Sequence, residues 1–204
     1  STSPEITDLK DNDYLYRTAP SDAFQGGVLA KLVLSKGIKK VALTYINNDY
    51  GVGLAGTFRS TYKAMGGVIT ADQVHEEKKQ SYRSELASLA SGGSSKLVII
   101  AMGEGSGMTM IRQSLEGGMF DTFIGADGMR TDKLVEGIGG KNLKGKFWGT
   151  LPAAKPSPQL DNFKAMYGDG KKFKFGSPFT AQGYDAVMLV PLAAQMAGSS
   201  DRTA

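Results

Sequence analysis

The sequence predicts an α/β fold in which helices cover both faces of a parallel sheet. Strand-like and helix-like segments alternate regularly along residues 14–150. The run "KLVIIAM" (96–102) is continuously apolar, as expected of a central parallel strand that is buried on both faces. Several expected helices end in a glycine pair, which supplies a left-handed cap residue at low cost. With right-handed βαβ crossovers, this pattern gives a three-layer domain.

Six segments rich in apolar and β-branched residues are the expected strands. In chain order they are residues 14–18, 39–46, 68–74, 96–102, 122–127 and 144–150. The first, "YLYRT", is short, whereas "KKVALTYI" at 39–46 has the longer apolar pattern of a buried strand. Segments of helical length separate these strands, which is the spacing of βαβ units.

Five segments between these strands are the expected helices. They are residues 21–37, 51–67, 81–93, 106–118 and 131–140. In the first of them, Ser21 or Asp22 can cap the N-terminus and Gly37 can end the helix. The glycine pairs close most of the others.

The pattern changes after residue 150. A proline-rich segment at 151–158 leads to two expected helices, at 158–168 and 177–198. Pro191 lies inside the second and should kink it. Because no strand is expected between or after these helices, we expect this stretch to belong to a domain that the sequence contains only in part.

Composition excludes several kinds of chemistry. Without cysteine, the chain has no disulfide, no thiolate metal site and no cysteine nucleophile. Any histidine-based metal site or Ser-His-Asp triad would rest on the single histidine, His75, which we expect to be exposed at a strand end. The net charge of +4 is modest, and the basic stretch at 169–175 is expected to be a solvated loop rather than a nucleic-acid site. We expect no metal and no cofactor.

One motif allows two interpretations. "GVGLAG" (51–56) has the G-x-G-x-x-G spacing of dinucleotide-binding proteins, and acidic residues follow at 76 and 77, about where a ribose contact is expected. However, "NNDY" separates the glycines from the end of the strand, and Asp49 would lie beside a phosphate. We therefore interpret the glycines as part of a longer loop and of close helix–strand packing. Tyr50 then lies beyond a strand end, where open α/β sheets bind ligands.

Six motifs together resemble a known family, the type I periplasmic solute-binding proteins of branched-chain amino acid ABC transporters, of which the Leu/Ile/Val-binding protein is typical. The resemblance covers essentially the whole chain. In order, the motifs are "TSPEIT" (2–7), "YRTAPSDAFQG" (16–26), "NNDYGVGLA" (47–55), "MIRQSLEGGM" (110–119), "FIGADG" (123–128) and "AQGYDAVMLV" (181–190).

The resemblance implies two α/β lobes that close around a ligand by a hinge motion. Residues 1–15 would be the end of a first-lobe segment, and 16–150 a complete ligand-binding lobe. Residues 151–204 would be helices that return to the incomplete first lobe. The chain is accordingly expected to be a fragment of the family's length, and not a well-behaved monomer by itself.

The resemblance also implies ligand-binding residues. Thr2 would bind the α-carboxylate of an amino acid with its hydroxyl group, and Ser1 would add a backbone contact. Tyr50 would reach the ligand from the complete lobe, and Asp127 would pair with the α-ammonium. From the residues alone, Asp127 can instead cap the next helix. Phe179 would be an apolar contact, with core packing as an equal alternative.

The sequence departs from the family at one of these positions. After the central strand the Leu/Ile/Val-binding protein has a tyrosine, where this chain has Gly103. We expect the missing aromatic ring to leave room for a different ligand, bordered by Met102 and Glu104. Glu104 can meet a polar or cationic ligand group or simply be an exposed acid at a helix start.

The expected function is the periplasmic or extracellular solute-binding component of an ABC transporter, not an enzyme. Its partners would be an amino acid or related small molecule and the transporter permease, without nucleic acid and without insertion in a membrane. A ligand-sensing domain of a receptor or regulator is the alternative. A nucleotide-dependent enzyme would rest on "GVGLAG" alone.

Overall fold

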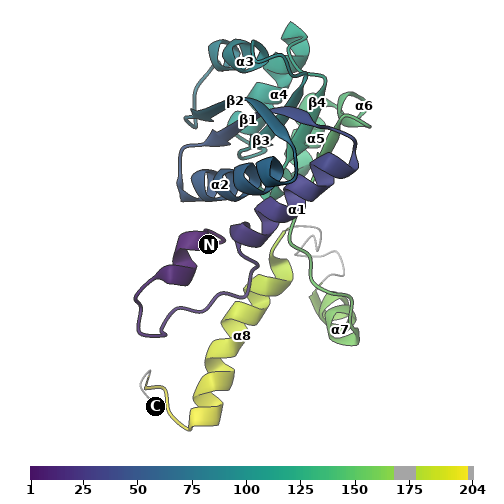
Figure 1. Ribbon diagram of the computed structural model, residues 1–204. Coiled ribbons are helices and arrows are strands. Elements are labelled where there is room, and N and C mark those ends of the chain that lie inside the picture. The colour runs from purple at the N-terminus through teal and green to yellow at the C-terminus, as the bar shows by residue number, and fades with distance from the viewer. Residues whose placement is uncertain (168–177, 202–204) are drawn as a thin grey trace. The chain divides into compact units, whose positions relative to one another are not determined.

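The computed structural model describes residues 1–167 and 178–201 (Figure 1). The basic stretch 169–175 lies outside these residues. The chain divides into two compact units, each described by itself. The sheet unit comprises residues 1–9 and 21–151, and the helical unit comprises residues 10–20 and 152–204. How the family's two lobes divide along this chain stays a prediction.

The sheet unit contains a five-stranded parallel sheet, which confirms the predicted fold class. Its strands, in the spatial order β2-β1-β3-β4-β5, are β1 (Lys40–Ile46), β2 (Val68–His75), β3 (Lys96–Ile100), β4 (Thr122–Gly125) and β5 (Phe147–Gly149). The chain leaves β1 toward one edge and returns past it to β3, so the strand order reverses between β1 and β3. In open α/β sheets this is where ligands bind, at the carboxyl ends of the strands.

Helices cover both faces of the sheet (Figure 1). They are α1 (Asp22–Ser35), α2 (Asp49–Ala64), α3 (Arg83–Ala90), α4 (Ser106–Gly117), α5 (Asp132–Ile138) and α6 (Gly140–Leu143). Short 3-10 turns lie at Pro4–Asp8 and Asp127–Met129. The expected glycine caps are present; for example, Gly118 ends α4 with a φ of 61°.

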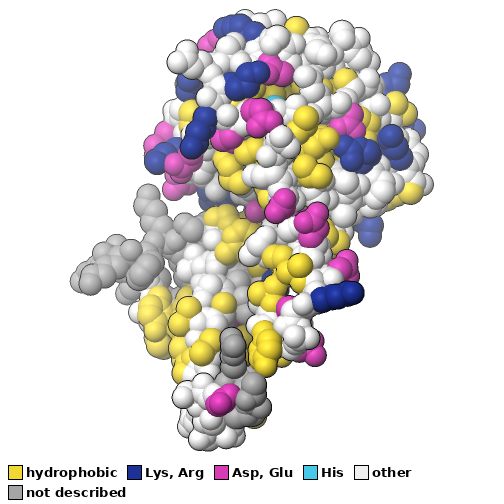
Figure 2. Space-filling model, turned by 90° about the vertical axis from the view of Figure 1, so that its left-hand side faces the viewer, with side chains coloured by type: hydrophobic (Ala, Val, Ile, Leu, Met, Phe, Trp, Pro, Cys, Tyr) yellow, Lys and Arg dark blue, Asp and Glu magenta, His cyan; other side chains and the backbone are white. Residues whose placement is uncertain are grey.

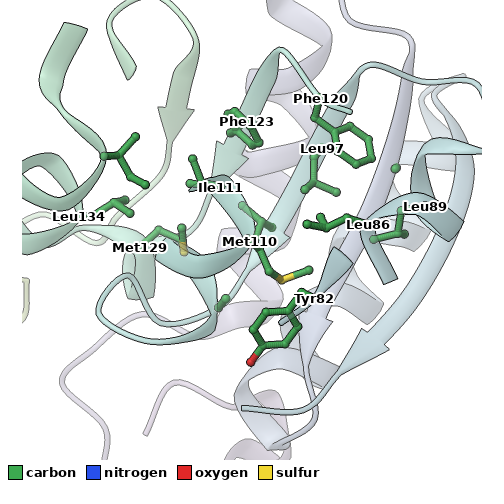
Figure 3. Packing of buried hydrophobic residues seen from close by; sticks show 14 of the residues in the cluster. Tyr82, Leu86, Leu89, Leu97, Met110, Ile111, Phe120, Phe123, Met129 and Leu134 are labelled. Carbon is green, nitrogen blue, oxygen red and sulfur yellow. The ribbon is translucent and has the colours of Figure 1, made fainter. Parts of the chain in front are cut away.

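The alternation of side chains along β3 explains its apolar sequence. Leu97 and Ile99 pack in the cluster with α3, α4, α5 and α6, where Figure 3 shows Leu97 among Leu86, Met110 and Phe120. Val98 and Ile100 face α1 and α2. Neighbouring residues of a strand point to opposite faces, so a strand covered on both sides is apolar throughout.

β5 is an edge strand of the sheet, and it carries the chain's one tryptophan. Trp148 pairs with Ile124 of β4 and is half-buried. The ammonium nitrogen of Lys36, just after α1, lies 5.4 Å from the centre of the indole ring, within cation–π range.

The helical unit holds α7 (Pro158–Tyr167) and α8 (Thr180–Ala197), the latter with Pro191 inside it as expected. Apolar side chains at the surface of α8 are at least half exposed (lower part of Figure 2). They are Val187, Leu189, Val190, Leu192 and Met196. The helical unit contains no strand among the described residues.

Two local predictions are wrong. Residues 14–18 form no strand; Tyr14 and Tyr16 are exposed, so β-forming side chains alone did not create one. The long loop expected at 47–50 is also absent, because Asn48 caps α2 with its side-chain oxygen, 2.8 Å from the Gly51 nitrogen. Tyr50 therefore lies in the first turn of a helix rather than in a loop.

Candidate functional site

Polar side chains gather at the carboxyl edge of the sheet, beside the N-terminus of α1. Tyr50 follows β1, Asp127 follows β4 and Thr150 follows β5, while Asp22 and Gln25 belong to the first turn of α1. The carboxyl ends of parallel strands meet at one edge of a sheet, and the helix N-terminus faces the same edge. The topology thus brings together residues that are far apart in sequence.

Glycine at position 51 allows α2 to begin so close to β1. A Cβ atom on Gly51 would lie 2.0 Å from the carbonyl oxygen of Ile46 and 2.7 Å from its Cγ2. Because no side chain fits there, Gly51 serves the close helix–strand packing that the sequence predicted. A Cβ atom on Gly53 would lie 2.9 Å from Pro4 Cδ, whereas a Cβ on Gly56 would meet nothing within 4 Å.

Tyr50 and Asp127 are directly hydrogen-bonded. The Tyr50 hydroxyl donates to Asp127 Oδ1 at 3.3 Å and accepts from the backbone N–H of Gly128 at 3.2 Å. Burial raises the pKa of the Tyr50 hydroxyl above its ordinary value, and the nearby charge of Asp127 raises it further. The phenol therefore remains protonated and acts as a hydrogen-bond donor.

Asp127 is a buried carboxylate rather than a helix cap. Burial raises its pKa, although hydrogen bonds from Gln25 and Tyr50 oppose the shift. The helix it was alternatively expected to cap, α5, is capped by Thr131, whose Oγ1 accepts from the Lys133 nitrogen at 3.2 Å. Helix capping therefore does not account for the buried carboxylate of Asp127. The negative charge of this carboxylate favours a cationic partner.

Gln25 orients the Asp127 carboxylate. Its Nε2 atom donates to Asp127 Oδ1 at 2.8 Å, and it lies 3.2 Å from the backbone oxygen and 3.3 Å from the Oγ1 of Thr150. Gln25 thereby connects α1 with the ends of β4 and β5. Sequence reasoning missed this residue.

A second buried acid, Asp22, was considered only as a possible helix cap. Ser21 is the cap instead, through a contact from the Ala23 nitrogen at 3.3 Å. Asp22 has no exposed surface, and its charge also raises the pKa of Tyr50. Its Oδ2 accepts from the Thr2 hydroxyl at 3.0 Å, and its backbone nitrogen donates to the Thr2 oxygen at 2.8 Å. The charges of two carboxylates, Asp127 and Asp22, therefore act on the Tyr50 phenol.

The structure thus brings Thr2, Tyr50 and Asp127 into one neighbourhood through Asp22 and Gln25. Ser1, at the edge of this group, is exposed, and its Oγ accepts from the Ser3 nitrogen at 3.3 Å. Phe179 belongs to the helical unit, half-buried just before α8, so its role stays a prediction.

Gly103 does not leave the expected room. Its nitrogen donates to the Gly128 oxygen at 2.8 Å. A Cβ atom there would meet Thr131 Cγ2 at 2.5 Å and the Met129 oxygen at 2.9 Å. Glycine at 103 therefore accommodates close packing of two loops, and the expectation of added space is wrong. Glu104 is exposed and bound to Thr131 and Lys133, 2.9 Å and 2.7 Å away.

His75 is also misjudged by the sequence, because it is buried. Only 3% of its surface is exposed. Its ring contacts Thr44 Oγ1 and Ser106 Oγ, at 2.8 Å and 3.2 Å. A strand-end position does not reveal this burial, which depends on Ser106 at the start of α4 and on Tyr82, both of which lie against the ring.

A pocket of about 670 Å³ lies between α5, α6 and β5; Thr150 lines it, whereas Tyr50 and Asp127 do not. Among residues 1–167 and 178–201, no group of three histidine, cysteine or acidic side chains is arranged to hold a metal ion. No helix in these same ranges is both long and apolar enough to cross a bilayer.

The fold and these contacts define a class of protein. A doubly covered parallel sheet with hydroxyl and carboxylate groups at its carboxyl edge is an α/β lobe built to bind a ligand. The chain belongs to the family described as "Receptor family ligand binding region", which matches residues 1–203. No curated protein matches the chain.

Solved structures of the same fold include binding proteins of transporters. The leucine-binding protein LivK from Thermotoga maritima is 25% identical, with a TM-score of 0.76 over 92% of this chain and 53% of that chain. LivJ from Streptococcus pneumoniae, in complex with isoleucine, is also 25% identical, with a TM-score of 0.69 over 95% of this chain and 54% of that one. A solute-binding protein from R. palustris in complex with 4-hydroxybenzoate shares the fold at 16% identity, with a TM-score of 0.72 over 92% of this chain and 52% of that one. The chain thus spans about half the length of these proteins.

Proposed function

We propose that this chain is the ligand-binding part of a solute-binding protein that delivers an amino acid to an ABC transporter. The observation that carries the proposal is the hydrogen-bonded group of Tyr50, Asp127 and Gln25 at the strand ends, with Asp22 nearby. Two buried acids whose charges both act on one phenol favour a cation that can donate several hydrogen bonds. The α-ammonium group of an amino acid has three such donors.

Each polar group has a role in this proposal. Asp127 pairs with the ammonium group of the ligand. The hydrogen bond from Gln25 fixes the orientation of the Asp127 carboxylate. Tyr50 donates its hydroxyl to a ligand oxygen or keeps Asp127 in place. Thr2, whose hydroxyl turns its one hydrogen from Asp22 to the ligand, and the backbone of the neighbouring Ser1 bind the carboxylate of the ligand. Phe179 contributes an apolar contact. Binding requires no catalytic acid, base, metal or cofactor.

The proposed location is the periplasm, or the cell exterior with a lipid anchor where no outer membrane exists. LivK and LivJ support the transport role, because their names specify leucine and branched-chain amino acid binding. The ligand domain of a receptor or regulator is the second candidate, favoured by the family's own description. A nucleotide-dependent enzyme is disfavoured, since Gly51 and Gly53 are explained by packing.

Thermal unfolding with a panel of small molecules tests the proposal. The panel contains amino acids, their amides, aromatic acids and NAD at millimolar concentration. For each amino acid that raises the Tm, two analogues follow, one without the ammonium and one without the carboxylate. We expect an amino acid to stabilise the protein and both analogues to do so much less. Stabilisation by NAD alone, or equal stabilisation by the analogue without an ammonium, would contradict the proposal.

Tyr50→Phe tests the contribution of the phenol. The substitution keeps the ring and removes the oxygen that lies 3.3 Å from Asp127 and 3.2 Å from the Gly128 nitrogen. We expect amino acid affinity to fall about threefold to tenfold, because a typical hydrogen bond contributes about 0.5–1.5 kcal/mol net and a tenfold change in affinity is about 1.4 kcal/mol. Calorimetry measures the affinity, and circular dichroism checks that the lobe stays folded. An unchanged affinity would make Tyr50 a packing residue.

A further inference from the structure

Four side chains away from the candidate site form a continuous chain of contacts. Thr44 Oγ1 lies 2.9 Å from the Gln73 backbone oxygen and 2.8 Å from His75 Nδ1. On the other side of the ring, His75 Nε2 lies 3.2 Å from Ser106 Oγ. Ser106 Oγ in turn lies 2.9 Å from Glu77 Oε2. The chain links β1, β2 and the start of α4.

Three of these four side chains are shielded from water, and Glu77 is partly exposed. Thr44, His75 and Ser106 have at most 3% of their surface exposed. The rings of His75 and Tyr82 are nearly perpendicular, with their centres 5.7 Å apart. A buried polar group that lacks a hydrogen-bond partner here has no water to replace it, and leaving it unsatisfied is unfavourable.

Counting hydrogens shows that the chain is incomplete with a neutral imidazole. Each of the four contacts needs one hydrogen. The contacts join Thr44 with the Gln73 carbonyl, Thr44 with His75, His75 with Ser106, and Ser106 with Glu77. Each hydroxyl supplies one hydrogen and a neutral imidazole supplies one, which makes three. The Gln73 carbonyl and the Glu77 carboxylate only accept. One contact therefore always lacks a hydrogen.

We propose that this chain of side chains, from Thr44 to Glu77, is a binding site for one additional proton. With the proton on the ring, His75 donates to Thr44 and Ser106, and these donate to Gln73 and Glu77.

The charged groups around the ring set the pH at which the proton binds. Burial lowers the pKa of His75 to about 4, whereas Glu77, Glu85 and Glu76 raise it and Lys79 lowers it. At neutral pH the ring is therefore uncharged and the chain of contacts lacks one hydrogen. Acidification supplies it.

The chain of contacts that would bind the proton ends at the start of α4. Gly105 precedes this helix and offers no side-chain cap, so Glu77 Oε1 accepts from the Ser106 nitrogen instead, at 2.6 Å. A Cβ atom on Gly105 would lie 2.0 Å from Glu77 Oε1, so a side chain at this position would displace the Glu77 carboxylate. The loop before Gly105 carries Gly103, which is hydrogen-bonded to Gly128.

Nuclear magnetic resonance of the histidine ring tests the proposal directly. His75 is the only histidine of the chain, so ¹⁵N-labelled histidine reports one ring whatever assembly the chain forms. We expect the wild-type ring signals to change between neutral pH and about pH 4. Glu77→Gln supplies the missing hydrogen permanently from its amide. In that variant we expect a neutral ring with hydrogen on Nδ1 throughout this range.

Two further variants keep the test decisive. Glu76→Gln removes an exposed neighbouring charge that contacts Asn47 Nδ2 at 2.6 Å, outside the chain of contacts. Because this charge raises the pKa of His75, its loss should move the titration to lower pH without changing the tautomer of the neutral ring. Ser106→Ala breaks the link between His75 and Glu77 and should change the titration and tautomer of the ring. The proposal is overturned if Glu77→Gln titrates like the wild type, or if Ser106→Ala leaves the ring signals unaltered.

Discussion

Replacing Asp127 with asparagine is expected to weaken amino acid binding at least tenfold. The substitution preserves size and removes the charge that we pair with the α-ammonium. Removing one partner of a buried charge pair typically costs about 2–5 kcal/mol, and a tenfold change in affinity is about 1.4 kcal/mol. Titration calorimetry with an amino acid found in the thermal panel measures the effect.

The fold should tolerate this substitution. Burial raises the pKa of Asp127, so the folded environment disfavours its ionised form, and a neutral side chain relieves that cost. Asp49→Asn is the matched control, since it removes an exposed carboxylate from the first turn of α2. We expect the control to bind like the wild type. If Asp127→Asn binds equally well, the residue has no direct role in recognition.

Gly51→Ala and Gly56→Ala are expected to change stability in opposite directions. Both add one methyl group to α2. At Gly51 the new atom would lie 2.0 Å from the Ile46 oxygen, so the helix or the strand must move. Forcing extra atoms into a packed region typically costs about 1–3 kcal/mol. At Gly56 there is no atom within 4 Å, and alanine should stabilise the helix by about 0.5–1 kcal/mol.

Urea unfolding of both variants beside the wild type checks this pair. The comparison separates packing from helix propensity, because the substitution and the helix are the same in both. Equal effects at the two positions would show that the contact between Gly51 and Ile46 does not constrain the fold. A loss at Gly51 alone would confirm that the glycine spacing has a structural origin.

The fold could be predicted because its signals are local and repeated. Alternating strand-like and helix-like segments and the glycines at helix ends mark the order and limits of the elements. The continuously apolar β3 indicates that helices cover both faces of the sheet. The strand predicted at residues 14–18 is absent because a strand also needs a neighbouring strand with which to pair. No local sequence pattern shows whether such a neighbour exists. The predicted start of α2 at residue 51 was also wrong, because Asn48 was not recognised as the residue that caps this helix.

The candidate site was predictable only in part. Tyr50 and Asp127 follow strands, and strand ends meet at one edge, so both positions are readable. Asp22 resembled a cap because it starts a helix, yet Ser21 holds that role. Gln25, three residues later, lies on the same face of α1 as Asp22, which is a signal that helical spacing offers. The burial of His75 arises from packing between distant segments.

The tryptophan at the sheet edge makes the protein a source of its own optical signal. Trp148 is the only indole in the chain, so long-wavelength excitation reports a single environment. It stands two residues, about 7 Å along the strand, before Thr150, which Gln25 contacts. A charged nitrogen near the ring, that of Lys36, makes the emission energy sensitive to small displacements of β5 against α1. Fluorescence can therefore follow events at the strand ends in unlabelled protein, at concentrations far below those that calorimetry needs.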